Sequence, residues 1–217
     1  MKRKSIYIVS ALVLAAVAVG GWQFVAQAGG GEATAVAHRE ALVRMHSQSL
    51  GRAEAPVQLV EFFDPACGTC AQFYPLVKKM MAANPQDIRL SVRYAAFHQG
   101  SGEVVKALEA SRRQGKFWPA LESLLENQSG WVQNHTAHVE MIWPYLARVG
   151  LDTERIKADM QSPEVARVIA QDMQDANKLE VTATPEYFVN GRPLPSFGWD
   201  QLVQLVHDEL AKSRKAG

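Results

Sequence analysis

A buried strand that stops at an Asp-Pro break, directly before two closely spaced cysteines, most restricts what this sequence can fold into. The run Val57 to Phe63 is apolar apart from two polar residues, one of them Glu61, a pattern typical of a strand buried on both faces. After the break, apolar residues recur at helical spacing from Cys67 to Asn84, with Pro75 inside the predicted helix. The sequence therefore predicts a strand, a tight turn and a helix whose N-terminus carries the cysteines.

The remaining segments predict an α/β fold in which a helical stretch interrupts a sheet. Residues 102–177 carry helical periodicity, and Ser162-Pro163-Glu164 is typical of a helix start. Asn190-Gly191 is typical of a hairpin turn. Further strands are predicted at Ala41 to Met45, Ile88 to Tyr94, Glu186 to Val189 and Arg192 to Pro195, and a last helix at Gln201 to Lys212 with Asp200 as its cap.

The first 28 residues are typical of an export signal or a membrane anchor. A basic leader, Lys2 to Lys4, precedes an apolar run that continues to Ala26. Cleavage after Ala28 would make the segment a signal peptide. If it is retained, Ile6 to Ala26 has about the 20 residues needed to span a bilayer. Either outcome places the rest of the chain in an oxidising compartment, where thiols exchange.

Composition and charge limit the classes of function. The chain is 47% hydrophobic and 21% charged, which suits a domain with a sizeable core. Its net charge of +1 provides no basic field for a nucleic-acid backbone, so nucleic acid is excluded as a partner. The predicted segments are 1–28 (signal or anchor), 29–40 (flexible linker), 41–101 with 178–217 (sheet-containing domain), and 102–177 (helical insertion).

Cys67 and Cys70 are the only two cysteines, and three interpretations of their spacing compete. A zinc site requires four ligands, and of the six histidines only His135 and His138 are near neighbours. A structural bridge across so small a loop would restrain the unfolded chain little. A redox pair is favoured, because N–H groups and the helix dipole would stabilise a thiolate on Cys67. Cys67 is then the exposed, acidic nucleophile, and Cys70 is the buried thiol that resolves the mixed disulfide.

Two motifs, VEFFDPACGTC and TATPEYFVNGRPL, together resemble the thioredoxin superfamily and, within it, the DsbA-like exported oxidoreductases. The resemblance covers residues 41–212 and implies a thioredoxin fold with an inserted helical domain, preceded here by the hydrophobic signal or anchor segment. It also implies a cis bond at Thr184-Pro185, with both residues in the substrate-binding site beside the cysteines. The residues alone favour an ordinary proline at the start of a strand.

The resemblance implies a further catalytic residue, Glu61, at a position where family members carry a buried acid. Its carboxyl would have a raised pKa and relay the proton of Cys70. The alternative is an acid at the strand end that reaches solvent. His98 is predicted to be structural. The tryptophans predicted to pack in the core or between domains are Trp118, Trp131, Trp143 and Trp199.

The sequence also departs from the DsbA prototype. Gly68-Thr69 stands between the cysteines, where the prototype has a histidine that stabilises the thiolate, so we predict a less oxidising protein. Thr184 before the proline is similar to the isomerases and reductases of the fold. The isomerases, however, carry a separate dimerisation domain, for which Ala28 to Glu40 is too short.

The predicted function is that of an extracytoplasmic thiol:disulfide oxidoreductase, located in the periplasm or another extracytoplasmic space. It would need no cofactor or metal, act on cysteine-containing exported proteins and use a membrane or periplasmic redox partner. One alternative is an isomerase or reductase of the same fold. Others are a copper-binding or electron-relay module that uses Cys67 and Cys70, and a chaperone-like peptide binder.

Overall fold

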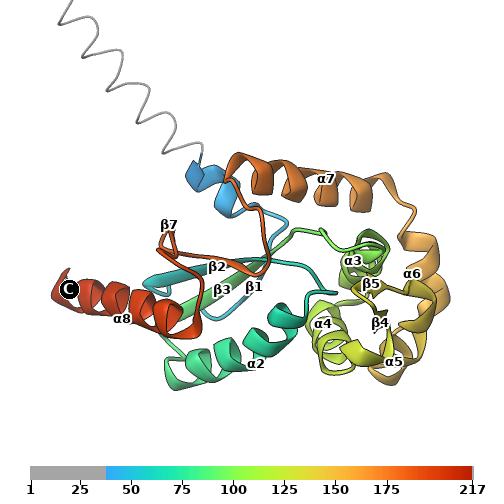
Figure 1. The fold of residues 1–217 in the computed structure, drawn as a ribbon, viewed down its shortest axis with the longest axis horizontal. Coiled ribbons are helices and arrows are strands. Elements are labelled where there is room, and N and C mark those ends of the chain that lie inside the picture. The colour runs from blue at the N-terminus through green and yellow to red at the C-terminus, as the bar shows by residue number, and fades with distance from the viewer. Residues whose placement is uncertain (1–37, 217) are drawn as a thin grey trace, which may run out of the picture. The chain divides into compact units, whose positions relative to one another are not determined.

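The computed structural model describes residues 38–216, and its central feature is a five-stranded mixed sheet with strand order β1-β3-β2-β6-β7 (Figure 1). β2 and β3 are parallel, and the other neighbouring strands are antiparallel. The predicted strands β2, β3 and β6 are confirmed with their predicted bounds. The strands of this sheet are β1 (Gln48–Leu50), β2 (Val57–Phe63), β3 (Ile88–Tyr94), β6 (Glu186–Val189) and β7 (Arg192–Pro193).

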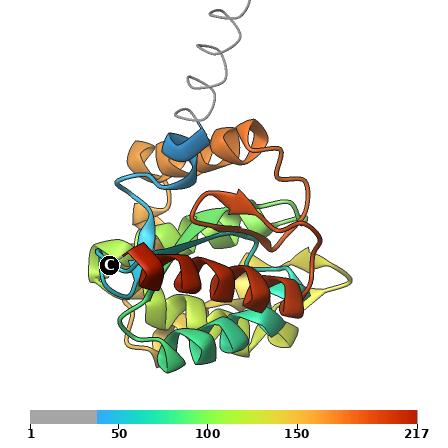
Figure 2. The ribbon, with the colours of Figure 1, turned by 90° about the vertical axis from the view of Figure 1, so that its left-hand side faces the viewer.

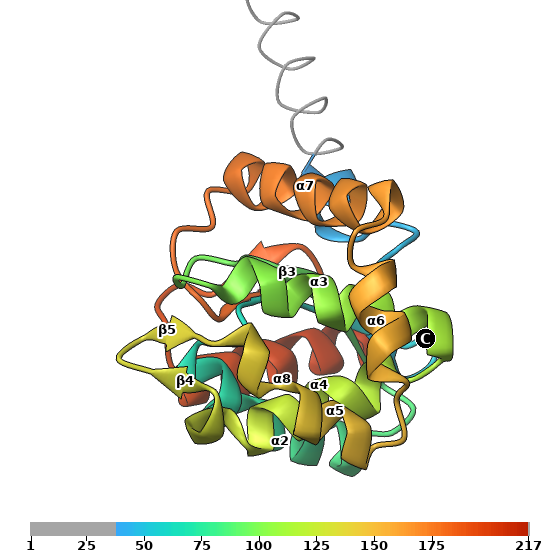
Figure 3. The same ribbon diagram turned by 90° about the vertical axis from the view of Figure 1, so that its right-hand side faces the viewer.

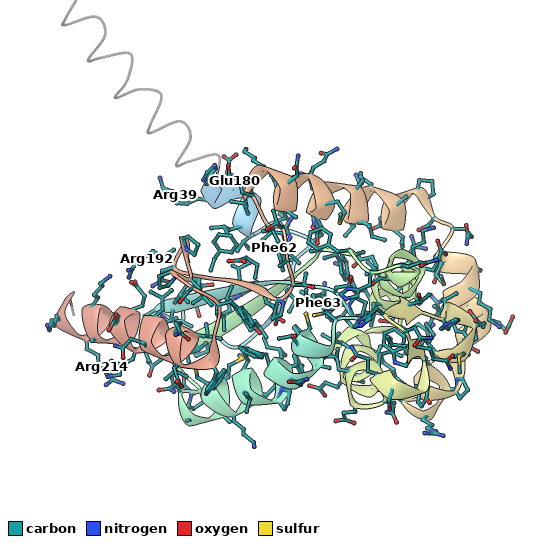
Figure 4. The ribbon with its side chains drawn as sticks, in the orientation of Figure 1. Arg39, Phe62, Phe63, Glu180, Arg192 and Arg214 are labelled. Atoms are coloured by element: carbon teal, nitrogen blue, oxygen red, sulfur yellow. The ribbon has the colours of Figure 1, made fainter. Side chains whose placement is uncertain are left out.

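Helices cover both faces of this sheet. α2 (Gly68–Ala83) and α8 (Trp199–Ala216) lie on one face, and α7 (Pro163–Lys178) lies on the other (Figures 1 and 2). The alternation of β2 separates two neighbouring phenylalanines labelled in Figure 4. Phe63 joins the main core with α2 and α8, whereas Phe62 packs with Ala176 of α7 in a smaller cluster. Burial of β2 on both faces is therefore confirmed.

The helical segment between β3 and β6 is also present and contains a small sheet that was not predicted (Figure 3). Trp131 is fully buried, and its indole N–H donates to the Leu124 carbonyl at 2.9 Å. Trp118, Trp143 and Trp199 pack against the same core. Before α7, this segment contains α3 (Ser101–Ser111), η1 (Arg112–Gln114), α4 (Phe117–Glu126), η2 (Gln128–Gly130), β4 (Val132–Gln133), β5 (Thr136–Ala137), η3 (Val139–Met141), α5 (Trp143–Arg148) and α6 (Thr153–Asp159). Its separation from the sheet as a domain at residues 102 and 177 stays a prediction.

The strand predicted at Ala41 to Met45 is wrong. Residues 38–42 are helical, and β1 begins only at Gln48. Ala41 and Leu42 are both buried and both strong helix formers, so their apolar character reflects one face of a helix. The chain then turns, with the Arg44 N–H donating to the Ser47 hydroxyl at 2.9 Å.

Two predicted boundaries also shift at the C-terminal end. α8 begins at Trp199, so Asp200 lies in the first turn of the helix and does not cap it. At this position its negative charge still lies near the positive end of the helix dipole. The hairpin strand β7 ends at Pro193 and does not reach Pro195.

A buried ion cluster joins α7 to the sheet. The Arg93 guanidinium of β3 is fully buried and lies 2.8 Å from Asp172 and 2.6 Å from Asp175, both on α7. Its Nη1 donates to the Ala41 and Leu42 carbonyls at 2.6 and 2.9 Å. Because these groups satisfy one another, the cluster fixes where the chain returns from the helical segment.

The predicted leader 1–28 and residues 29–37 of the predicted linker lie outside the described residues, whereas residues 38–40 are helical. Among the helices of residues 38–216, none combines the length and the apolar character needed to cross a membrane.

Candidate active site

Cys67 occupies the N-cap position of α2, as the strand-turn-helix pattern predicts. Its backbone is extended, with φ −75° and ψ 118°, and its Sγ accepts the N–H of Cys70 at 3.5 Å. The sulfur thus takes the place of the side-chain oxygen that usually caps a helix. The Cys67 carbonyl accepts the Ala71 N–H at 3.2 Å and so takes part in the first turn of the helix.

The two thiols differ in pKa far more than in exposure. Cys67 is only 5% exposed and Cys70 is 1% exposed, so the expectation of an exposed Cys67 is wrong for the residue as a whole. A hydrogen bond from the Cys70 thiol, helped by the Thr184 side chain and the N–H groups of Cys70 and Thr69, lowers the pKa of Cys67 to about 5. Burial raises the pKa of Cys70 well above 9.0, and its bond to Cys67 and the nearby Glu61 charge add to this rise.

The loop before β6 lies against the Cys67 sulfur. The Thr184-Pro185 peptide bond is cis, and the Cys67 sulfur lies 3.1 Å from the Thr184 carbonyl oxygen, to which it donates when it is protonated. Thr184 is half-buried and Pro185 is buried. The structure therefore brings these two residues, which lie far from the cysteines in sequence, to the sulfur atom.

Glu61 lies inside β2 and is 2% exposed, so it does not reach solvent. Burial, together with the nearby Cys67 charge, raises its pKa to about 8. Tyr187 is its cross-strand partner on β6 and limits this rise. The Tyr187 hydroxyl is buried without a well-formed hydrogen bond, and its own pKa is raised by burial and then by Glu61. Tyr187 is a neighbour of the site that the sequence did not identify.

Asp64 is a second neighbour that the sequence did not identify. It is fully buried, and its carboxylate accepts the N–H groups of Ala66 at 2.8 Å and of Phe97 at 2.7 Å. The His98 N–H and its Nδ1 lie 2.8 and 2.9 Å from the same carboxylate, and the Ser101 hydroxyl donates to it. Asp64 therefore ties the loop before Cys67 to the loop after β3. His98 has a structural contact here, in line with its predicted role.

The helical segment supplies a third unpredicted neighbour, Gln128, whose amide N–H groups donate to the carbonyls of Pro65 and Cys67. As for metals, the described part of the chain contains no group of three or more His, Cys, Asp or Glu side chains placed to hold an ion.

Comparisons with known proteins agree with this geometry. The sequence profile of the thioredoxin family matches residues 44–208. The chain belongs to the thioredoxin family. A solved structure of a thioredoxin-like oxidoreductase from Silicibacter pomeroyi DSS-3 is 32% identical, with a TM-score of 0.69, and the match covers 82% of this chain and 99% of that one. The predicted thioredoxin-like α/β fold is confirmed.

Two curated relatives extend the comparison. A probable disulfide bond formation protein D of Bacillus cereus is 27% identical over 175 residues, which cover 76% of this chain and 79% of that protein. This match confirms the resemblance to DsbA-like oxidoreductases. A Na⁺/H⁺ antiporter NhaA of Herminiimonas arsenicoxydans is 34% identical over 144 residues, which cover 66% of this chain and 22% of the antiporter. The match thus spans about a fifth of the length of that relative.

Proposed function

We propose that this chain is a thiol:disulfide oxidoreductase that exchanges disulfides with protein cysteines through Cys67, Gly68, Thr69 and Cys70. The opposite pKa shifts of the two thiols carry the proposal. With a pKa of about 5, reduced Cys67 is a thiolate at neutral pH, whereas Cys70 remains a thiol. Since the thiolate is the attacking form, Cys67 is the nucleophile and Cys70 the resolving group.

The exchange needs only the two sulfur atoms. The Cys67 thiolate attacks a substrate disulfide, forms a mixed disulfide and releases one substrate thiolate. Cys70 then loses its proton and attacks the Cys67 sulfur, which releases the second thiolate and leaves a Cys67-Cys70 disulfide. Two electrons have then passed to the substrate, and the reverse sequence oxidises a substrate dithiol. The pair requires no bound cofactor, because a redox partner resets its state.

Glu61 is the proposed acceptor of the Cys70 proton. Glu61 and Cys70 lie close enough that the charge of Glu61 raises the pKa of Cys70. A carboxyl with a pKa of about 8 matches the acidity of a thiol far better than an ordinary glutamate does. In the mixed disulfide Cys67 no longer carries the charge that helps to raise this pKa, so more of the Glu61 carboxyl is ionised and able to accept the proton. Proton transfer to Glu61 would allow Cys70 to attack from a buried position that water hardly reaches.

Thr184 and Pro185 are the proposed substrate-binding residues. The Thr184 carbonyl oxygen lies 3.1 Å from the Cys67 sulfur, at which the mixed disulfide would form. An extended substrate segment placed along residues 184–186 would therefore bring its cysteine directly to Cys67. Such pairing uses hydrogen bonds of the substrate backbone and does not depend on the substrate's side chains, which suits a protein that acts on many substrates.

The proposed location is the periplasm or another extracytoplasmic space, with cysteine-containing exported proteins as substrates and a membrane or periplasmic redox partner. The basic and apolar leader supports this proposal. Cell fractionation and the mass of the isolated N-terminus test it. A chain that starts at Gly29 indicates a cleaved signal, an intact chain in the membrane fraction indicates an anchor, and a cytoplasmic soluble pool contradicts both.

The decisive experiment on activity is to trap substrates with Cys70→Ala. The chain has only two cysteines, so any mixed disulfide in this variant must form at Cys67. We expect reductant-sensitive adducts with Cys70→Ala, none with Cys67→Ser, and turnover of a test disulfide only by the unmodified protein. Metal retained on purification without dithiol turnover would favour the copper module. Peptide binding that survives Cys67→Ser, without disulfide turnover by the unmodified protein, would favour a peptide binder.

A further inference from the structure

Gln128 makes direct contact with the backbone on both sides of Ala66, immediately before α2. Its Nε2 donates to the Pro65 carbonyl at 2.8 Å and to the Cys67 carbonyl at 3.0 Å. Gln128 belongs to η2, which follows α4, so this contact spans more than sixty positions of sequence. Its Oε1 lies 3.8 Å from the point that a Cβ on Gly68 would occupy. The amide group therefore covers the start of the cysteine loop.

The Cys67 carbonyl is a sensitive point in this loop. It also accepts the Ala71 N–H at 3.2 Å, so its direction is shared between the first turn of α2 and Gln128. On the same residue, Sγ accepts the Cys70 N–H at 3.5 Å, an ordinary distance for a sulfur acceptor. Because hydrogen bonds weaken with poorer distance and angle, a rotation of the Cys67 backbone would weaken the bond between its sulfur and the N–H groups at the start of the helix.

The loop is held from two sides. On one side the Asp64 carboxylate accepts the Ala66 N–H at 2.8 Å, and the Asp64 carbonyl accepts the Cys67 N–H at 3.0 Å. On the other side Gln128 is the donor to the carbonyls of Pro65 and Cys67. Asp64 thus fixes N–H groups of the loop, and Gln128 fixes its carbonyl groups.

We propose that Gln128 is a positioning residue for the redox pair, through which the inserted helices hold the Cys67 backbone so that its sulfur faces the first turn of α2. This inference rests on the proposed function of the same cysteines. Gln128 itself takes no part in electron or proton transfer. Its effect is on the acidity of Cys67, and hence on the balance between the reduced and oxidised pair.

Two variants separate positioning from folding. Gln128→Met keeps the length of the side chain and loses both donors. Gln128→Glu keeps the shape and places a carboxylate against two carbonyls and near a thiolate. The matched control is Gln114→Met. Gln114 also bonds a backbone through its amide, donating to the Asp152 carbonyl at 3.0 Å and accepting the Asp152 N–H at 2.9 Å, but away from the cysteines.

The experiment measures the Cys67 pKa in the full chain from the pH dependence of alkylation and of thiolate absorbance. We expect Gln128→Met to raise this pKa by about one unit, which lowers the thiolate fraction below pH 5 roughly tenfold and slows alkylation there. The same shift lowers the redox potential by about 30 mV in glutathione buffers. Gln128→Glu should raise the pKa further, and Gln114→Met should leave it unchanged.

Each result has one meaning for the inference. If the pKa and the potential of both Gln128 variants equal those of the unmodified protein, Gln128 does not position the pair. If the Gln114 control shifts as far as Gln128→Met, the effect is general loosening of the helical segment, and the inference is also overturned. Since the titration requires no turnover, failure of the proposed function is seen separately, as an unmodified protein that exchanges no disulfides.

Discussion

The low pKa of Cys67 makes the stability of the reduced protein depend on pH in a direction that can be measured. The folded thiol titrates near 5 against an ordinary value of 9.0. A depressed pKa contributes stability that is complete above pH 9 and is lost as the pH falls through 5. At pH 7, two units above the folded pKa, this contribution to the unfolding free energy is about 2.7 kcal/mol. At pH 5 about 0.4 kcal/mol of it remains. Reduced protein should therefore gain about 2 kcal/mol from this thiol between pH 5 and pH 7.

Glu61 changes the stability with pH in the opposite direction, so its contribution has to be separated from that of Cys67. Its folded pKa of about 8 lies above the ordinary 4.5, so its contribution is present at low pH and is lost as the pH rises through 8. Comparing reduced protein with Cys67→Ser largely removes this effect, because Glu61 is present in both. Because the variant lacks the thiolate charge that helps to raise the Glu61 pKa, ionised Glu61 destabilises the variant slightly less at pH 7. The expected difference of about 2 kcal/mol is therefore an upper value.

The assay is urea unfolding of both proteins at pH 5 and pH 7 in the presence of a phosphine reductant. The difference in unfolding free energy between the reduced protein and Cys67→Ser should grow toward about 2 kcal/mol at the higher pH. A difference that is the same at the two pH values would refute the low pKa. It would then remove the main argument for Cys67 as the nucleophile.

Four further outcomes are expected. Alkylation of reduced protein at mildly acidic pH should modify Cys67 well ahead of Cys70, and equal labelling would refute the assignment. Glu61→Gln should slow resolution of the mixed disulfide by about 10²-fold without unfolding the protein; unchanged stopped-flow kinetics would leave Glu61 a structural role. Asp172→Ala should lower the unfolding free energy by about 1–3 kcal/mol, because it leaves the Tyr94 N–H and donors of the buried Arg93 without an acceptor while Asp175 still balances the Arg93 charge; an unchanged unfolding free energy in urea would contradict this. Equilibration with glutathione should give a potential between about −270 mV for thioredoxin and about −120 mV for DsbA, because a Cys67 pKa of about 5 lies between about 7 and about 3.5; a potential equal to that of DsbA would contradict the reasoning.

The central strands could be predicted because their signals are local. Val57–Phe63 is a long apolar run and Ile88–Tyr94 alternates cleanly, so each strand appears with its predicted bounds. The two-residue strands β4 and β5 are too short to show any period. They form because the Ala137 N–H donates to the Gln99 carbonyl at 2.8 Å and because the turn places Asn134 and His135 at positive φ. Neither cause can be seen in the sequence around residues 132–137.

The residues of the site likewise fall into those that have a local sequence signal and those that have none. The spacing of Cys67 and Cys70 after a strand identifies the helix N-terminus, and the pairing of β2 with β6 would have identified Tyr187 opposite Glu61 if the register had been known. Asp64 could be read only as a strand breaker, because its partners at residues 97–101 lie beyond β3. Gln128 carried no signal at all, since nothing in a helical segment marks an amide that reaches back to a distant loop.

The acidity of Cys67 shows why counting charges in the sequence is incomplete. The neutral Gly68-Thr69 pair suggests a weakly stabilised thiolate, yet the hydrogen bond from Cys70, the Thr184 side chain and the helix N–H groups together lower its pKa to about 5. None of these groups carries a positive charge, so their effect depends on distance and angle and should be only slightly screened by salt. The redox balance of this protein should therefore respond more to contacts that hold the Cys67 backbone than to the residues between the two cysteines.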